Sequence, residues 1–158
     1  MAISVRPATS EDRDALGDLL EHLYGRRAAH SLPVVRQESA TLTAEIDGQI
    51  VGLVVLTCVD YGVEAYAAVE ELVVAPAHRG AGVGRALVSR ARSWAREQQC
   101  EVLFVSALDD AAAAFYRRTG FTDCTGPWLY AIPRLDPSLA NTGRAAARSP
   151  HRGESSPG

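Results

Sequence analysis

The chain has 158 residues, of which 47% are hydrophobic and 22% charged, and its formal net charge is −3. This is the composition of one ordinary globular domain, and the weakly acidic balance gives no indication of a nucleic-acid partner. The longest apolar run, from Ile50 to Leu56, is far too short to cross a membrane. Three widely spaced cysteines without a CxxC or Cys/His cluster indicate reduced thiols and no metal site. Because the N-terminus lacks the apolar core of a signal peptide, we expect a cytoplasmic protein.

The first expected elements are a short strand and a helix. Residues 3–5 alternate apolar and polar side chains before a proline, which predicts the strand. Thr9 or Ser10 is the expected helix N-cap, because acidic residues follow it, and Gly25 marks the end of the helix. The leucines of its apolar face are spaced by three and four and are Leu16, Leu19, Leu20 and Leu23.

The middle of the chain predicts three antiparallel strands. A weak helix is expected over 34–39, before the first of them. Asp47-Gly48 predicts a tight hairpin turn between the first two strands, because glycine tolerates positive φ there. The second strand is almost continuously apolar and should therefore be buried on both faces. The three strands are expected at 42–46, 50–59 and 65–74.

The second half alternates helices and strands. A helix is expected from Val83, with an apolar face formed by Leu87, Val88, Ala91, Trp94 and Ala95. A short strand at 102–105 and a helix capped by Asp109 or Asp110 and ended by Gly120 follow it. The last predicted strands are 121–125 and 128–135. This order predicts a mixed α/β (α+β) domain over residues 1–135, with a largely antiparallel sheet flanked by helices. Residues 136–158 have almost no large apolar side chains and are expected to be a disordered tail.

One loop carries recognisable chemistry. A buried strand ends at Val74, and a helix starts directly after the run Arg79-Gly80-Ala81-Gly82-Val83-Gly84-Arg85. Helix N-terminal amides bind anions when the backbone can approach closely, and the glycines permit that approach while the two arginines add charge. A dinucleotide loop requires GxGxxG, but Arg85 occupies the final position, and a P-loop requires a lysine, which the chain lacks. The remaining alternative to a phosphate site is a plain glycine-rich turn before a helix.

At this point the sequence resembles the GNAT superfamily of N-acetyltransferases. The first matching motif is Val74-x-Pro76-x-x-Arg79-Gly80-x-Gly82-x-Gly84, and the second is Ala112-x-x-Phe115-Tyr116-x-x-x-Gly120-Phe121. The resemblance covers residues 3 to 135 and implies the GNAT-type fold. It also implies a β-bulge in the strand before the loop and a V-shaped splay between the fourth and fifth strands, where pantetheine would bind as an added strand.

The resemblance further implies acetyl-CoA as cosubstrate, without a metal. Backbone groups near the end of the strand would bind pantetheine and polarise the thioester carbonyl. Asp109 stands where many relatives have an asparagine that contacts the coenzyme, so its role as a ligand is open. The expected coenzyme-binding residues are Leu72, Val73, Val74, Arg79, Gly80, Ala81, Gly82, Val83, Gly84, Arg85 and Asp109.

Two residues are the catalytic candidates that the resemblance implies. Tyr116 would protonate the departing thiolate, and Glu70 would take a proton from the acceptor ammonium. Glu71 is the alternative, as a substrate-binding residue. Because neighbouring strand residues point to opposite faces, only one of the two glutamates is expected to face the slot.

The acceptor is expected to be a primary amine of a small molecule, polyamine- or aminoglycoside-like, or of a peptide. Tyr24 and Trp128 are further substrate-binding candidates, and acidic side chains would favour a cation; those are Asp60, Glu64, Glu70 and Glu71. A non-catalytic acyl-CoA-binding sensor or interaction module is the alternative function. No nucleic-acid or membrane partner is expected, and the protein would be a monomer or a homodimer.

Overall fold

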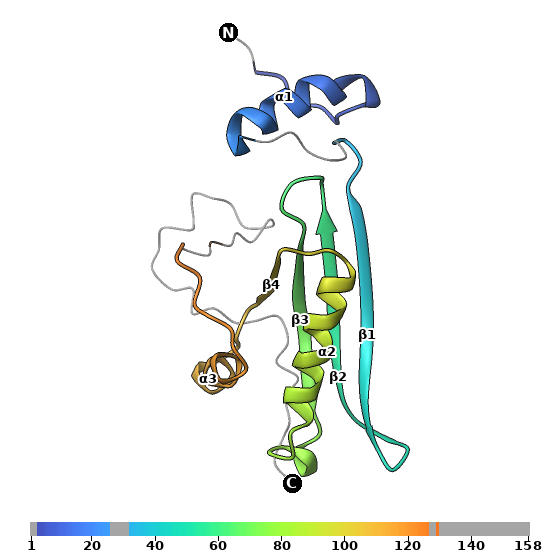
Figure 1. The fold of residues 1–158 in the computed structure, drawn as a ribbon, viewed down its shortest axis with the longest axis vertical. Helices are drawn as coiled ribbons and strands as arrows, with labels where there is room; N and C mark the ends of the chain where they lie inside the picture. The colour runs from blue at the N-terminus through green and yellow to red at the C-terminus, as the bar shows by residue number, and fades with distance from the viewer. Residues whose placement is uncertain (1–2, 26–31, 127–128, 130–158) are drawn as a thin grey trace. The chain divides into compact units, whose positions relative to one another are not determined.

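The computed structural model describes residues 3–25, 32–126 and 129, and it divides the chain into two units, the first of which ends at Ser106. The first unit contains η1 (Ser10–Asp12), α1 (Arg13–Tyr24), β1 (Arg36–Ile46), β2 (Gln49–Asp60), β3 (Tyr66–Val74), η2 (Pro76–His78), α2 (Val83–Glu97) and β4 (Val102–Val105) (Figure 1). The second unit contains α3 (Asp110–Arg118). The predicted mixed α/β class is confirmed. None of the described helices is both long and apolar enough to span a membrane.

The sheet has the strand order β1-β2-β3-β4. The first three strands are antiparallel, as predicted, and β4 pairs in parallel with β3. Asp47 and Gly48 form the turn between β1 and β2 with φ values of 51° and 77°, which is the left-handed region that glycine tolerates. A parallel pair requires a crossover connection, and α2 provides it between β3 and β4.

Helix α2 and one face of the sheet form the hydrophobic core. The five α2 residues predicted to face inward are all buried. On β2, Val54, Leu56 and Cys58 are almost fully inaccessible, but the residues between them are only half-buried. The strand was predicted to be buried on both faces, and it is fully buried only on the face toward the core. Gly52 allows the helix to lie close to the sheet, because a Cβ there would stand 3.1 Å from side-chain atoms of both Val83 and Leu87.

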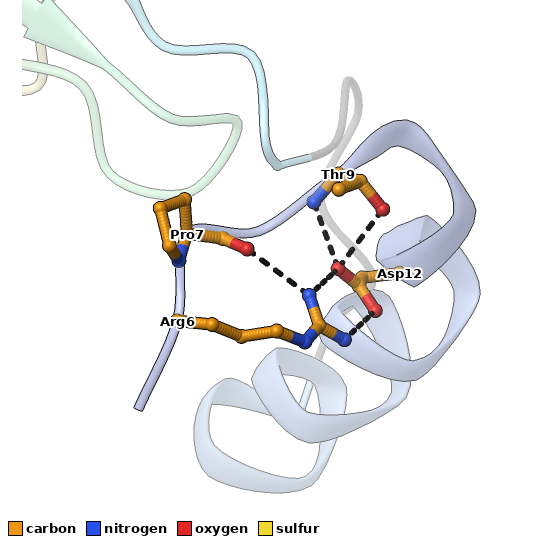
Figure 2. Close-up of polar contacts among 4 residues, drawn as sticks. All are labelled: Arg6, Pro7, Thr9 and Asp12. Carbon is orange, nitrogen blue, oxygen red and sulfur yellow. Dashed lines mark hydrogen bonds and ion pairs between the residues drawn. The ribbon is translucent and has the colours of Figure 1, made fainter. Parts of the chain in front are cut away.

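The prediction of a first strand at residues 3–5 is wrong. Ile3 and Val5 lie in no strand, and their exposed fractions are 85% and 94%. The Arg6 guanidinium instead donates two 2.8 Å hydrogen bonds to the two carboxylate oxygens of Asp12, which also accepts the backbone N–H of Thr9 (Figure 2). The hydrogen bonds from Arg6 and Thr9 hold the pKa of the Asp12 carboxyl well below its usual range. The segment is therefore fixed to the start of the helix.

The helix predicted after residue 9 is confirmed, and it ends at Gly25, which adopts φ 68°. Residues 34–39, by contrast, do not form the predicted weak helix, since β1 already begins at Arg36. The reason is the length of the partner strand. Arg36 pairs with Asp60 at the far end of β2, and every residue of β1 from there to the hairpin finds a partner on β2.

In the second unit, residues 121–125 do not form the predicted strand. The backbone N–H of Phe121 instead donates to the carbonyl oxygen of Tyr116, at the end of α3. The Asp123 carboxylate accepts hydrogen bonds from the Arg117 side chain, so this segment folds back on the helix end. The predicted strand at 128–135 and the tail at 136–158 lie outside the described residues, apart from Leu129.

Candidate functional site

The turn from β3 into α2 is the segment for which the sequence predicts a phosphate loop. After β3 ends at Val74, the N–H of Ala75 still donates to the carbonyl oxygen of Val51, at 2.8 Å. The Arg79 side chain reaches back and donates from Nε to the carbonyl oxygen of Val74, at 3.3 Å. These bonds fix both ends of the turn to the sheet.

Two glycines then open the N-terminus of α2. Gly80 and Gly82 have φ values of 81° and 89°, and a Cβ placed on either would meet no atom within 4 Å. Gly82 is the N-cap residue, so the first amides of the helix, from Val83 onward, have no intrahelical acceptor. Ala81 and Arg85 are exposed beside them. The loop has the conformation and the open space that an anion requires at a helix N-terminus.

Strand β3 contains the β-bulge that the resemblance implies. Leu56 of β2 pairs with Val69, but its neighbour Val55 pairs with Glu71, so Glu70 is an extra residue on β3. A bulge of this kind bends a strand and changes which way its side chains point. The extra residue is the predicted catalytic base.

The bulge corrects the expectation that Glu70 and Glu71 point to opposite faces. Before it, Ala67 and Val69 belong to the core on the α2 side, and after it Leu72 and Val74 do so. The residues of β3 that face the core are therefore odd-numbered before the bulge and even-numbered after it. Glu70 and Glu71 stand between Val69 and Leu72 in the sequence, and both are exposed. Regular alternation does not hold across an inserted residue, and so both carboxylates are available on the face opposite α2.

A residue that the sequence analysis did not single out contacts Glu70. The Thr57 hydroxyl on β2 donates a 2.5 Å hydrogen bond to Glu70 Oε1. Thr57 pairs with Ala68, two residues before Glu70, so the contact runs diagonally across two neighbouring strands. The one sequence signal for it was a hydroxyl residue in an otherwise apolar strand.

The pairing between β3 and β4 ends before β3 does. The last pair is Val69 with Val105, whereas β3 continues to Val74. Over 70–74, one edge of β3 is paired with β2, and its other edge has no ladder partner in the part of the chain that the structure describes. Unpaired backbone groups at a strand edge can accept an extended ligand.

Two further predicted site residues belong to the second unit: Tyr116, the expected acid, lies on α3, and Asp109, an expected coenzyme ligand, directly precedes it. Asp109 is the N-cap of this helix, and its Oδ1 accepts the N–H of Ala112 at 2.8 Å. Tyr116 packs edge-to-face between the rings of Phe115 and Phe121, with ring centroids 5.1 and 5.4 Å away. The helix and its cap are as predicted, and the aromatic packing fixes the orientation of the Tyr116 ring.

The residues predicted to lie near the acceptor amine have different surroundings. Tyr24 ends α1 and hydrogen-bonds with Tyr61, which raises the pKa of the Tyr61 phenol. Asp60 is only 8% exposed, and its carboxylate accepts the N–H of Gly62 and contacts Arg36 at 3.4 Å. Asp60 is therefore a structural group and not part of an acidic acceptor surface. Trp128 lies outside the described residues.

Comparison with known proteins places this geometry among acetyltransferases. The model of the acetyltransferase (GNAT) family matches residues 6–121. An uncharacterized N-acetyltransferase of Methanocaldococcus jannaschii is 29% identical over 107 residues, which are 63% of this chain and 47% of that protein. The chain thus spans about half the length of this curated relative.

Solved structures share the fold at lower identity. A ribosomal-protein-alanine N-acetyltransferase of Brucella melitensis biovar Abortus superposes with a TM-score of 0.52 at 21% identity, over 60% of this chain and 71% of that one. The aminoglycoside acetyltransferase AAC(6')-Iy, bound to the bisubstrate analogue CoA-S-monomethyl-acetylneamine, gives a TM-score of 0.54 at 19% identity, over 61% and 70%. With the family model covering most of the chain and both motifs in place, this protein belongs to the acetyltransferase (GNAT) family.

Proposed function

We propose that the protein is an N-acetyltransferase that moves an acetyl group from acetyl-CoA to a primary amine of a small cationic molecule or a peptide. The observation that carries this proposal is the glycine-opened N-terminus of α2, which directly follows the strand that contains the bulged Glu70. The proposed anion site and the proposed base would thus lie on consecutive elements of one unit.

The donor half would use the turn and the free edge of β3. The pyrophosphate of acetyl-CoA would accept hydrogen bonds from the first α2 amides, with Arg79 and Arg85 at the rim. Pantetheine would lie along the unpaired edge of 70–74, where β3 and β4 would splay apart, and a backbone N–H near Leu72 to Val74 would polarise the thioester carbonyl.

The transfer needs two proton movements. Glu70 would take a proton from the acceptor ammonium, directly or through water, so that the free amine can attack the thioester carbonyl carbon. The carbon–sulfur bond then breaks as the amide forms, and Tyr116 would give its proton to the departing thiolate. As the amide forms, the nitrogen loses a second proton, which would pass through solvent to the tyrosinate, and Glu70 would release its own proton to solvent to close the cycle.

The two glutamates favour a cationic acceptor. Glu70 and Glu71 are exposed on the same face, and paired carboxylates attract an ammonium group while they help to remove its proton. The structural neighbours are named as aminoglycoside N-acetyltransferases and as a ribosomal-protein-alanine N-acetyltransferase. A compact polyamine or aminoglycoside and a peptide N-terminus are therefore the acceptors to test first.

The test is a mass-spectrometric screen of acetyl-CoA with spermidine, sisomicin and an alanine-initiated peptide. We expect one of these amines to gain an acetyl group. Tyr116→Phe should bind acetyl-CoA with unchanged affinity and lower kcat about a hundredfold, because general acid catalysis contributes roughly 10²-fold or more. Tyr66→Phe, which removes a tyrosine hydroxyl from a ring packed against Phe104, is the matched control and should keep the wild-type rate.

Two outcomes would contradict the proposal. If the purified protein binds acetyl-CoA but acetylates no amine across a wider panel of amino acids and peptides, it is an acyl-CoA-binding module and not an enzyme. If Tyr116→Phe turns over as fast as Tyr66→Phe, then Tyr116 is not the general acid.

A further inference from the structure

We propose that Thr57 is a positioning residue for the catalytic carboxylate of Glu70. This inference rests on the proposed function, because it gives Thr57 a role only if Glu70 acts as the base. The contact that carries it is the 2.5 Å hydrogen bond from the Thr57 hydroxyl to Glu70 Oε1.

The bulge makes this contact possible. Thr57 pairs with Ala68 on the face opposite α2, and Glu70 follows on that same face before the register changes. A glutamate at a bulge lacks the regular cross-strand neighbour that would restrict its side chain. Three torsions then separate the carboxylate from the backbone, and a hydrogen bond from the neighbouring strand removes much of this freedom.

Threonine is suited to the task. Its side chain is branched at Cβ, which restricts χ1, and Thr57 is half-buried in the centre of the sheet. The hydroxyl is therefore held by rigid elements, as a supporting group for a functional side chain needs to be. The Thr57 hydroxyl takes one acceptor position on Oε1, and the other acceptor positions of the carboxylate would serve an incoming ammonium group or a bridging water.

The alternative is that the hydrogen bond only strengthens the sheet. An exposed hydrogen bond of this kind contributes little to folding, and Glu70 does not need it to remain solvated. If the bond were purely structural, removing the Thr57 hydroxyl would change turnover by the same factor whether residue 70 is Glu or Gln. The two interpretations therefore differ in one measurable quantity, the coupling between positions 57 and 70 in turnover.

The experiment is a double-mutant cycle on the full chain. Initial rates of acetyl transfer from acetyl-CoA are measured with whichever of spermidine, sisomicin and the alanine-initiated peptide is turned over fastest. The variants are Thr57→Val, which keeps the shape but removes the hydroxyl, Thr57→Ser, which keeps the hydroxyl, Glu70→Gln, and the Thr57→Val/Glu70→Gln double variant. Thermal unfolding of each variant verifies that it is folded.

We expect Thr57→Val to lower kcat about tenfold with an unchanged KM for acetyl-CoA, since misplacing a catalytic group by about 1 Å can slow turnover up to 10²-fold. Thr57→Ser should retain most of the wild-type rate. Glu70→Gln should lower kcat about a hundredfold, and adding Thr57→Val to it should lower kcat no further.

The possible failures are distinct. If Glu70→Gln slows turnover but Thr57→Val does not, or if Thr57→Val slows both backgrounds equally, the positioning role is wrong and the proposed base stands. If Glu70→Gln keeps the wild-type rate, the base assignment is wrong, and the role of Thr57 is wrong with it.

Discussion

At the scale of single residues, the three thiols of the chain differ sharply in their surroundings. Cys58 is buried in the core, and its Sγ lies 3.2 Å from that of Cys100, which donates a hydrogen bond to it. Burial, together with this hydrogen bond, raises the pKa of the Cys100 thiol to about 12. Cys124 is exposed. The reactivity of a cysteine depends on the fraction of its thiol that is ionised and on the exposure of its sulfur to solvent.

These environments predict which thiol reacts. Iodoacetamide at pH 8 should modify Cys124 in the folded protein and leave Cys58 and Cys100 unmodified. Cys58 is buried away from the reagent, and the raised pKa of the Cys100 thiol leaves little thiolate at this pH. Peptide mass spectrometry before and after unfolding in guanidinium chloride measures the order in which the three cysteines are modified. Modification of Cys100 as fast as Cys124 in the folded state would contradict the burial described above.

The candidate site illustrates what the residues alone could predict. The glycine loop, the helix cap at Asp109 and the presence of Glu70 follow from local spacing, because each depends on neighbours in the sequence. The shared face of Glu70 and Glu71 does not, since it results from a register shift against β2. The Thr57 contact likewise depends on which residues of two strands face each other.

At the scale of elements, the close approach of α2 to the sheet depends on Gly52. A Cβ at this position would lie 3.0 Å from the carbonyl oxygen of Val73 and 3.1 Å from side-chain atoms of Leu87 and Val83. The backbone oxygen cannot move without disturbing β3. Any larger residue must therefore displace the helix or the strand.

We expect Gly52→Ala to lower the free energy of unfolding by about 1–3 kcal/mol through overpacking. Chemical denaturation with urea, followed by circular dichroism, measures the change. Gly126→Ala is the matched control, because a Cβ there meets no atom within 4 Å, and it should change stability by less than about 0.5 kcal/mol. Equal stability of the two variants would mean that α2 does not pack as described.

The elements with strong local signals were predicted well, and those defined by partners were not. Helix α2 and strand β4 begin where the sequence indicated, because a glycine N-cap and a short apolar run mark them. The start of β1 at Arg36 is determined by the length of β2, and residues 3–5 remain outside the sheet despite their alternation. A strand depends on its partner, which composition does not reveal.

At the scale of the whole molecule, the first unit carries all of the expected coenzyme-binding residues except Asp109. The anion loop, the bulge and the unpaired edge of β3 all belong to residues before Ser106, and the proposed acid Tyr116 belongs to the second unit. The proposed base Glu70 also belongs to the first unit, so we expect the effects of the loop and of α3, not of the two units as wholes, to be separable by mutation. A change in the loop should affect coenzyme affinity, and a change on α3 should affect turnover.

Calorimetric titration of CoA into Gly82→Ala, with Gly48→Ala as the control, tests directly whether the turn between β3 and α2 holds the coenzyme pyrophosphate. Both glycines have positive φ, 89° and 77°, with no atom within 4 Å of an added Cβ, so each variant should lose about 1–2 kcal/mol of stability from backbone strain. Only at Gly82 would the methyl group obstruct a phosphate approaching the N-terminus of α2.

We expect wild-type protein and Gly48→Ala to bind CoA with equal Kd, and Gly82→Ala to bind at least about tenfold more weakly, since close backbone approach is lost. Equal affinity of the two variants, or no binding of CoA by the wild-type protein, would contradict the claim that the turn between β3 and α2 holds the coenzyme pyrophosphate.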